Sequence, residues 1–381
     1  MNICFLMSNL DPSVGGTERV TISIAKKLST IGYKVFFIYT SKDNISIPRE
    51  QKLYINYSNE IGSIKENVLS YLSQNKILLL VVVNRVFQTK KYQNIYRYVK
   101  QNSQIKIIAS LHASPDNWVN KNKWGLVLPK VYFKEKIKSI LFKFWNPHVR
   151  RVVGTYNVVD KYLLLSKSYF ESFKHIYPIK DNGKKLIAIP NPFPFDDNVD
   201  CMNKENIVLI VARMQEDQKR IYAALKIWNI VQRNNPNWKL VVVGNGPHLN
   251  DYKEIATDLH NVQFVGHSNC VQEFYKSSKI FLMTSIWEGL PMTLIEAMHY
   301  GCIPIAFDSF DAIHDIISNQ YTGYIIPNND INKFTERLNF IMNNPKVIDD
   351  MSQRIMSQTN KFEINEIIKI WNNEIHKICQ S

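Results

Sequence analysis

The sequence predicts an α/β protein built from two doubly wound domains, each with a parallel sheet covered by helices on both faces. Its 381 residues exceed what a single ordinary hydrophobic core holds. Short continuous runs of Val, Ile and Leu indicate parallel strands that are buried on both faces. Longer helical stretches separate these runs, as in βαβ units, and the alternation occurs in both halves of the chain.

Several runs in each half have the length and composition of such strands. In the first half they are residues 3–7, 35–39, 77–83, 105–111, 162–165 and 186–189. In the second half they are residues 207–212, 239–243, 262–265, 280–283, 303–307 and 324–326. Ligands of open α/β sheets bind beyond the carboxyl ends of the strands, so the residues that follow each run are the first candidates for a site.

The boundary between the domains is expected within IPNPFPFDDNVD, residues 189–200, because prolines, aspartates and asparagines suit a linker better than a helix or strand. We therefore expect an N-terminal domain over residues 1–190 and a C-terminal domain over residues 191–364. The final helix, residues 365–381, is expected to pack back on the N-terminal domain.

Cysteine usage and hydropathy exclude several classes of protein. The five cysteines are scattered without a CxxC pair, which argues against a metal cluster or a disulfide framework and favours a reducing compartment. The initial MNICFLMSNLDP lacks the basic segment of a targeting signal. The longest aliphatic run, residues 77–83, is far shorter than the roughly 20 residues that span a bilayer. We expect a cytoplasmic protein, soluble or peripheral at a membrane.

Positive charge is concentrated in the first half of the chain. Residues 1–190 hold 30 Lys and Arg against 11 Asp and Glu, a balance of +19, and the rest balances at −5, which gives the net +14. Residues 121–151 combine nine Lys and Arg with six large aromatic side chains. This pattern is typical of a segment that binds an anionic membrane surface, and an ordinary surface helix with core-facing aromatic residues is the alternative.

Two glycine-containing turns follow predicted strands. In SNLDPSVGGTERV, Gly15 and Gly16 precede a predicted helix and would let backbone amides approach a phosphate or a sugar. In KLVVVGNGPHLNDY, Gly244 and Gly246 form a tight turn that matches neither the dinucleotide fingerprint nor the P-loop. For both segments a purely structural turn is the alternative.

Three basic side chains also follow predicted strands. Arg213 and Lys219 stand on either side of a short polar loop before a helix, where two cations would neutralise a diphosphate. Solvated loop charges are the alternative. His112 follows the run at 105–111, a position well suited to chemistry, although a single histidine is more often structural.

The segment SIWEGLPMTLIEAMHYG, residues 285–301, places one carboxylate, Glu288, in a loop and another, Glu296, in an apolar helical run. A buried charge is expensive unless it is paired, so Glu296 is expected to accept hydrogen bonds from a polar ligand. Pro291 suits the first helical position and Gly301 the position after the helix. The backbone expected to face an anion or a sugar hydroxyl comprises Gly289, Leu290, Pro291, Met292, Thr293 and Leu294.

In this order the motifs resemble those of the family 4 glycosyltransferases, retaining enzymes of the GT-B fold that use nucleotide sugars. EGLPMTLIE is similar to the family's E-x7-E element, ARMQEDQKR to its Arg and Lys phosphate element, GNGP to its glycine turn and GGTER to its N-terminal loop. The likeness covers nearly the whole chain and is strongest over residues 207–307. It implies two Rossmann-like doubly wound domains facing a central cleft.

The resemblance implies a role for each motif residue. Glu296 would bind the ribose hydroxyls of the nucleotide, and Glu288 would lie near the donor sugar. The amides after Gly289 would hold the sugar hydroxyls and the phosphate. Arg213 and Lys219 would stabilise the diphosphate leaving group, although they are six positions apart here and five in many family members.

Gly16 would let the N-terminal loop close over the diphosphate, and His112 would lie beside the reacting sugar. The implied reaction moves a hexose or N-acetylhexosamine from a nucleotide sugar, expected to be UDP-linked, to a glycan or lipid-linked glycan in surface polysaccharide, lipopolysaccharide or capsule synthesis. Cations and helix N-termini would stabilise the leaving group without a metal or another cofactor. Front-face attack, which retains the anomeric configuration, makes Glu288 a poor covalent nucleophile.

Two alternatives stay open at this point. A sugar-nucleotide epimerase on the same fold would turn over without an acceptor. A basic nucleic-acid-binding protein would explain the charge and the aromatic residues, but it predicts no nucleotide-sugar site. For the transferase we expect no nucleic acid partner, and we expect the basic half to contact the anionic inner face of the cell membrane.

Overall fold

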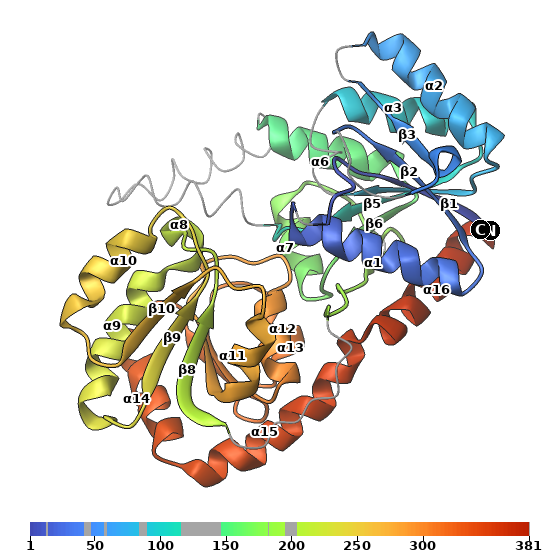
Figure 1. Cartoon of the computed structure of the whole chain (residues 1–381). Helices are drawn as coiled ribbons and strands as arrows, with labels where there is room; N and C mark the ends of the chain where they lie inside the picture. The colour runs from blue at the N-terminus through green and yellow to red at the C-terminus, as the bar shows by residue number, and fades with distance from the viewer. Residues whose placement is uncertain are drawn as a thin grey trace. The chain divides into compact units, whose positions relative to one another are not determined.

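The computed structural model describes residues 1–12, 14–41, 47–56, 59–83, 90–115, 146–181, 183–194 and 204–380 (Figure 1). The chain divides into two compact units. Unit 1 contains Met1–Pro194 together with Ile364–Ser381, and unit 2 contains Phe195–Glu363. The sequence placed the boundary at residues 190–191 and the start of the returning helix at residue 365.

Unit 1 is built on a seven-stranded parallel sheet in the order β3-β2-β1-β4-β5-β6-β7. The six strands predicted for the first half are confirmed, and β3 was missed because its three residues are too few and too polar to form an apolar run. The strands are β1 Asn2–Leu6, β2 Lys34–Tyr39, β3 Lys52–Tyr54, β4 Leu79–Val83, β5 Lys106–Leu111, β6 Lys161–Leu164 and β7 Leu186–Ala188.

The last helix of the chain belongs to the core of unit 1. α16 packs against α1, and the hydroxyl of Tyr33 donates to Asn372 Oδ1 at 2.8 Å. Ile367, Trp371 and Ile375 on the apolar face of α16 are buried. The described helices of this unit are α1 Gly16–Thr30, α2 Ile61–Gln74, α3 Lys90–Asn102, α6 Pro147–Val158, α7 Tyr169–Ile176 and α16 Ile364–Gln380, with the 3-10 turn η1 Arg49–Gln51.

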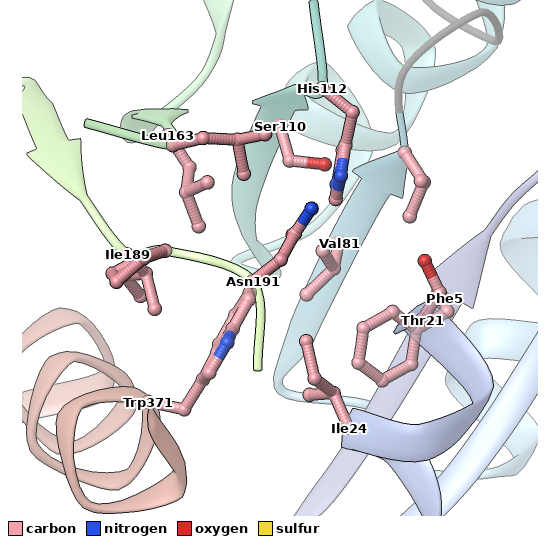
Figure 2. Close-up of a pocket in the computed structure, with 13 residues that line it drawn as sticks. Phe5, Thr21, Ile24, Val81, Ser110, His112, Leu163, Ile189, Asn191 and Trp371 are labelled. Carbon is pink, nitrogen blue, oxygen red and sulfur yellow. The ribbon is translucent and has the colours of Figure 1, made fainter. Parts of the chain in front are cut away.

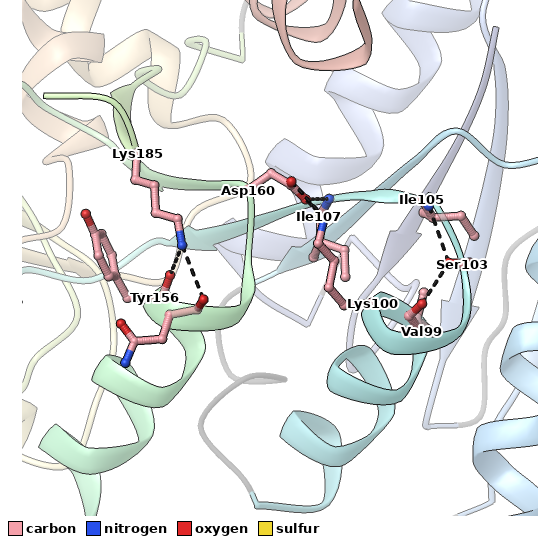
Figure 3. Close-up of polar contacts among 9 residues, drawn as sticks. Val99, Lys100, Ser103, Ile105, Ile107, Tyr156, Asp160 and Lys185 are labelled. Atoms are coloured by element: carbon pink, nitrogen blue, oxygen red, sulfur yellow. Dashed lines mark hydrogen bonds and ion pairs between the residues drawn. The ribbon is translucent and has the colours of Figure 1, made fainter. Parts of the chain in front are cut away.

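Polar contacts near the amino ends of β5, β6 and β7 tie helices to the sheet of unit 1 (Figure 3). The carboxylate of Asp160 accepts from Lys100 Nζ on α3 and from the amide of Ile107, each at 2.8 Å. Lys185 Nζ donates to the carbonyl of Tyr156 on α6 at 2.7 Å. The loops that carry the candidate residues lie at the opposite edge of the sheet, at the carboxyl ends of the strands.

Unit 2 is built on a six-stranded parallel sheet in the order β10-β9-β8-β11-β12-β13. All six strands predicted for the second half are confirmed. The strands are β8 Glu205–Val211, β9 Lys239–Val243, β10 Val262–Gly266, β11 Ser278–Met283, β12 Ile303–Asp308 and β13 Tyr324–Pro327.

Helices cover both faces of the second sheet in the order expected of βαβ units. The α-helices are α8 Glu216–Lys219, α9 Ile221–Val231, α10 Leu249–Ile255, α11 Val271–Ser277, α12 Met292–His299, α13 Ile313–Ile316, α14 Ile331–Met342 and α15 Pro345–Thr359. The 3-10 turns are η3 Gln232–Asn234, η4 Ala256–Asp258 and η5 Asn360–Phe362. Ile221, Leu225 and Trp228 of α9 are buried.

In both sheets the strand order reverses direction beside the first strand of the unit. β1 lies between β2 and β4, and β8 lies between β9 and β11. Ligands of open parallel sheets bind outside the carboxyl ends of the strands at such a point. In unit 2 the loops after β8 and β11 begin there, at residues 212 and 284, and they carry Arg213 and Glu288.

No helix in the described part of the chain is both long enough and apolar enough to be a membrane span. Residues 121–145 of the basic aromatic stretch lie outside the described residues. Residues 146–151 lead into and begin α6.

Candidate active site

The loops after β8 and β11 are bonded to each other, and this brings the predicted phosphate and sugar residues of unit 2 together. The amide of Ile286 donates to the carbonyl of Gln218 at 2.7 Å, and Thr284 Oγ1 donates to the carbonyl of Lys219 at 2.9 Å. Gln218 Nε2 also donates to the carbonyl of Trp287 at 3.2 Å. The short helix α8 is thereby fixed against the segment that precedes Glu288.

Lys219 and Glu288 form an ion pair at this place, with 2.5 Å between Nζ and Oε1. Their side chains are only 16% and 9% exposed, so the pair is largely shielded from solvent. The sequence predicted both residues at the site, one at the diphosphate and one near the sugar, and the structure adds that they contact each other. Arg213 is exposed on the same loop, and no ion pair joins it to another described residue.

Arg220 is a site residue that the sequence motifs missed. Its backbone is left-handed (φ 52°), and its side chain is buried directly after Lys219. Nε donates to the carbonyl of Thr284 at 2.9 Å, and the two terminal nitrogens bond the side-chain oxygens of Asn328 and Asn329. Desolvation lowers the pKa of Arg220 to about 10, so it remains a cation at neutral pH. It joins the turn between α8 and α9 to the loops after β11 and β13.

Glu296 is buried in α12 and has a polar partner within unit 2. Its Oε2 accepts from the hydroxyl of Tyr275 at 2.9 Å, and the glutamate is 5% exposed. Burial and the neighbouring carboxylate raise the pKa of Tyr275 well above its ordinary value, so the phenol stays protonated and remains a donor. The ring of Tyr275 stacks on that of Tyr300 at 5.8 Å, which fixes its direction. The hydrogen bond from Tyr275 therefore stabilises the carboxylate of Glu296 within its apolar surroundings.

The N-terminus of α12 offers fewer free amides than the sequence suggested. Pro291 is the N-cap and has no N–H, and its carbonyl accepts from the amides of Leu294 and Ile295 at 3.0 and 3.2 Å. The expectation of a free Leu294 amide was therefore wrong, and the first helical residue is Met292. The amides of Met292 and Thr293 occupy the first two positions, which have no intrahelical acceptor. Together with the helix dipole they suit an anion.

The C-terminal end of this segment follows the sequence prediction, whereas Pro291, which was expected at the first helical position, is the N-cap. Gly301 stands after the C-cap of α12 with φ +71°, the left-handed conformation expected at that position. Gly289 and Leu290 lie in the loop between Glu288 and the N-cap, and Leu290 is buried.

The glycines after β9 have a structural explanation. Gly244 has φ +136°, and a Cβ there would lie 1.9 Å from the carbonyl oxygen of Ala212. A Cβ on Gly246 would lie 2.5 Å from the carbonyl oxygen of Met214. The close approach is thus made by the loop after β8, whose position these glycines allow, and this favours the alternative of a structural turn.

Gly16 differs from these glycines. It is exposed as the first residue of α1, with no positive φ, and a Cβ there would meet nothing within 4 Å. Gly15 has an extended backbone and would bring a Cβ 2.7 Å from Glu18 Oε2, which a flexible side chain can relieve. Nothing among the described residues requires glycine at position 16, so the space beside it is available to a ligand.

His112 follows β5 in unit 1 and lines a small cavity of about 10 Å³ (Figure 2). Its Nδ1 is buried and has no hydrogen-bond partner among the described residues. Burial lowers the pKa of His112 to about 4, so the ring is neutral at neutral pH. A neutral imidazole at the end of a strand can donate or accept one hydrogen bond to a ligand, and it is a weak base.

Two units, each built on a parallel sheet with helices on its faces, are the architecture of the GT-B fold. Residues 196–358 match the model of the family described as "Glycosyl transferases group 1". The match covers most of unit 2, which is therefore similar to the sugar transferases of that group.

Similar proteins with curated names are glycosyltransferases, and solved structures share the fold. An uncharacterized glycosyltransferase of Haemophilus influenzae is 26% identical, over 97% of this chain and 98% of that protein. A Campylobacter jejuni protein, named as an alpha-1,4-N-acetyl-D-galactosaminyltransferase that acts on a GalNAc-containing diNAcBac-PP-undecaprenol, is 24% identical over 97% of each chain. Among solved structures, HepE of Anabaena in complex with UDP has a TM-score of 0.74 at 13% identity and covers 99% of this chain and 100% of its own.

Proposed function

We propose that the protein is a retaining transferase that moves a hexose or N-acetylhexosamine from a UDP-linked donor to a glycan or lipid-linked glycan of a bacterial surface polysaccharide, lipopolysaccharide or capsule. The observation that carries the proposal is the shielded ion pair between Lys219 and Glu288 in unit 2. It lies just before the N-terminus of α12, the helix in which Glu296 is buried.

The residues of this site have complementary roles in the proposal. Lys219, Arg213 and the first amides of α12 form a positive surface for a diphosphate. As the bond between the anomeric carbon and the diphosphate oxygen breaks, negative charge grows on that oxygen and these groups stabilise it. Glu296, held by Tyr275, accepts hydrogen bonds from the ribose hydroxyls.

Retention follows if the acceptor hydroxyl attacks the anomeric carbon from the side that the diphosphate leaves. Its oxygen bonds to that carbon, and its proton passes to the departing phosphate oxygen. The ion pair with Lys219 supports this route, because a carboxylate bound at 2.5 Å to a lysine is a poor covalent nucleophile. Glu288 instead orients the lysine and offers an acceptor to a sugar hydroxyl. For His112 we propose the role that the family resemblance implies, a contact with the reacting sugar.

The relatives support the donor and the acceptor class. HepE, which shares the fold, is solved with UDP. The Campylobacter transferase acts on a glycan that is linked through PP to undecaprenol. We extend both features to this chain, a UDP-linked donor and an acceptor on a lipid diphosphate.

An acceptor on a lipid also accounts for the basic first half. We place the protein at the inner face of the cell membrane, where each Lys or Arg near an anionic surface contributes about 1 kcal/mol of binding. Reversing Lys134, Lys136 and Lys138 to Glu should reduce flotation with anionic vesicles at low salt and leave donor hydrolysis intact. Wild-type protein that fails to float with such vesicles would contradict this placement.

The proposed reaction is tested by mixing the protein with a panel of UDP- and GDP-sugars and a lipid-linked acceptor extract, and by measuring release of the free nucleotide. Release should increase when the acceptor is added, persist in EDTA and fall at least a hundredfold in Arg213→Ala. Turnover of the sugar without an acceptor would favour the epimerase, and loss of activity in EDTA that a divalent ion restores would contradict the metal-free route.

A further inference from the structure

One cavity in unit 1 combines buried polar groups that the proposed reaction leaves unexplained. It lies at the carboxyl ends of β4, β5 and β6, between these strands and the helices α1 and α16 (Figure 2). Apart from His112, its lining holds no titratable side chain among the described residues. Its polar members are Thr21, Ser110, His112, Asn191 and Trp371.

Two of these groups lack the partners that buried polar groups normally have. Nδ1 of His112 and Nε1 of Trp371 are both buried without a hydrogen bond among the described residues. More than nine in ten buried polar groups are satisfied by protein or by ordered water. The cavity measures about 10 Å³, which is about the room that one water molecule needs. Polar lining and size together indicate a site for a bound water.

The neighbours of the His112 ring supply the other contacts that such a water requires. In Figure 2 the hydroxyl of Ser110 and the side-chain amide of Asn191 point toward the ring, whereas Trp371 closes the cavity from the side of α16. Ser110 Oγ is 3.5 Å from the carbonyl of Val82, its acceptor, so its own lone pairs remain available. Asn191 is 8% exposed and can donate through its amide.

We propose that Ser110 and Asn191 hold one buried water that donates a hydrogen bond to His112 Nδ1, which fixes the imidazole as the tautomer with its hydrogen on Nε2. The water accepts from the Asn191 amide and donates its two hydrogens to Nδ1 and to Ser110 Oγ, and Nε1 of Trp371 is not part of this network. Asn191 and Ser110 are then positioning residues, and His112 presents an N–H donor to its ligand and no lone pair.

Burial lowers the pKa of His112, and the neutral ring that results has the one nitrogen lone pair that this arrangement uses at Nδ1. The inference rests on the proposed function only in making the sugar the ligand of Nε2. The water and the tautomer follow from the cavity alone.

The test is nitrogen-15 NMR of histidine-labelled full-length protein, with the His112 signals assigned by comparison with His112→Gln. At pH 7.5 the wild type should show Nδ1 as an acceptor and Nε2 as protonated. Asn191→Asp keeps the shape but replaces the donor by a carboxylate, and it should raise the titration midpoint of His112 by at least one pH unit. Trp371→Phe keeps the wall of the cavity and should leave tautomer and midpoint unchanged.

Kinetics distinguish positioning from a general loss of structure. Asn191→Leu and Asn191→Asp should lower kcat at least tenfold with a donor KM within twofold, at unchanged circular dichroism. A wild-type ring with its hydrogen on Nδ1, or the same midpoint in wild type and Asn191→Asp, would overturn the inference even if the protein transfers sugar. The expected NMR result in a protein that transfers no sugar would overturn the proposed function and leave the tautomer assignment standing.

Discussion

The ion pair between Lys219 and Glu288 leads to a prediction about UDP affinity. The direction of the change shows whether the carboxylate competes with the diphosphate for Lys219 or helps to bind it. We expect Glu288→Gln to bind UDP more tightly than the wild type and to transfer sugar more slowly. Glu288 contacts the nitrogen that a diphosphate would also contact, with 2.5 Å between Nζ and Oε1. The substitution removes the negative charge of Glu288. Lys219 is then free to contact the diphosphate, and the repulsion between the carboxylate and the diphosphate is lost.

The burial of the pair sets the size of the effect. Two unit charges 4 Å apart interact by about 4 kcal/mol at an effective dielectric constant of about 20, and by about 1 kcal/mol in water. The side chains of the pair are 16% and 9% exposed, so we expect the interaction energy at this place to lie between these two values. After the cost of leaving Lys219 unpaired, a gain of about 1–2 kcal/mol remains, which corresponds to a dissociation constant for UDP roughly five- to thirtyfold lower.

Calorimetric titration of UDP into wild type and Glu288→Gln measures this difference, and the chain provides a matched control. Glu205 pairs with Lys239 at 2.7 Å in the same unit, but its side chain is 59% exposed. An exposed pair contributes little, so Glu205→Gln should change neither UDP affinity nor the melting temperature. Equal or weaker UDP binding by Glu288→Gln, at an unchanged melting temperature, would refute competition for the lysine.

Three further predictions follow from other contacts. Gly16→Ala should fold normally but lower kcat/KM at least tenfold in a donor titration. Gly244→Ala should destabilise unit 2 by more than about 3 kcal/mol in urea unfolding, because the added Cβ meets a backbone oxygen. Glu296→Ala should weaken UDP binding by about 1.5–3 kcal/mol, and Tyr275→Phe by less, in the same calorimeter. Burial, then the nearby charge of an arginine, lowers the pKa of His148 to about 4 in the folded state, from about 6.5 when unfolded. Its contribution to stability is therefore complete above pH 6.5 and lost as the pH falls to about 4, so His148→Gln should reduce the acid-induced loss of stability by up to about 3 kcal/mol in melts at pH 7.5 and 4.5.

Most strands of the two sheets could be predicted from the sequence, because a parallel strand that is buried on both faces consists of a continuous run of apolar residues. β8, Glu205–Val211, and β11, Ser278–Met283, are examples in which pattern and structure coincide within two residues. β3, Lys52–Tyr54, has no such pattern, since it is short and only partly buried and is held by its pairing with β2. A strand of this kind is specified by its neighbours.

The site was less accessible to sequence reasoning because its partners are distant in the chain. The positions of Glu288 and Glu296 on a loop and on a helix followed from local signals, but their contacts did not. Lys219 lies 69 positions from Glu288, and Tyr275 lies 21 positions from Glu296. Arg220 was missed because a left-handed residue between two helices is usually Gly or Asn, and an arginine there gives no local signal.

The central claim is that this chain transfers a sugar from a nucleotide donor with retention of configuration. The sharpest test is proton NMR of the glycoside formed from an α-configured UDP-sugar and a lipid-linked acceptor, because a glycosidic bond keeps its anomeric configuration in solution. We expect an α-anomeric signal that appears only with acceptor present and is lost in Lys219→Ala. A β-anomeric product, or consumption of the donor with no glycosylated acceptor, would contradict it.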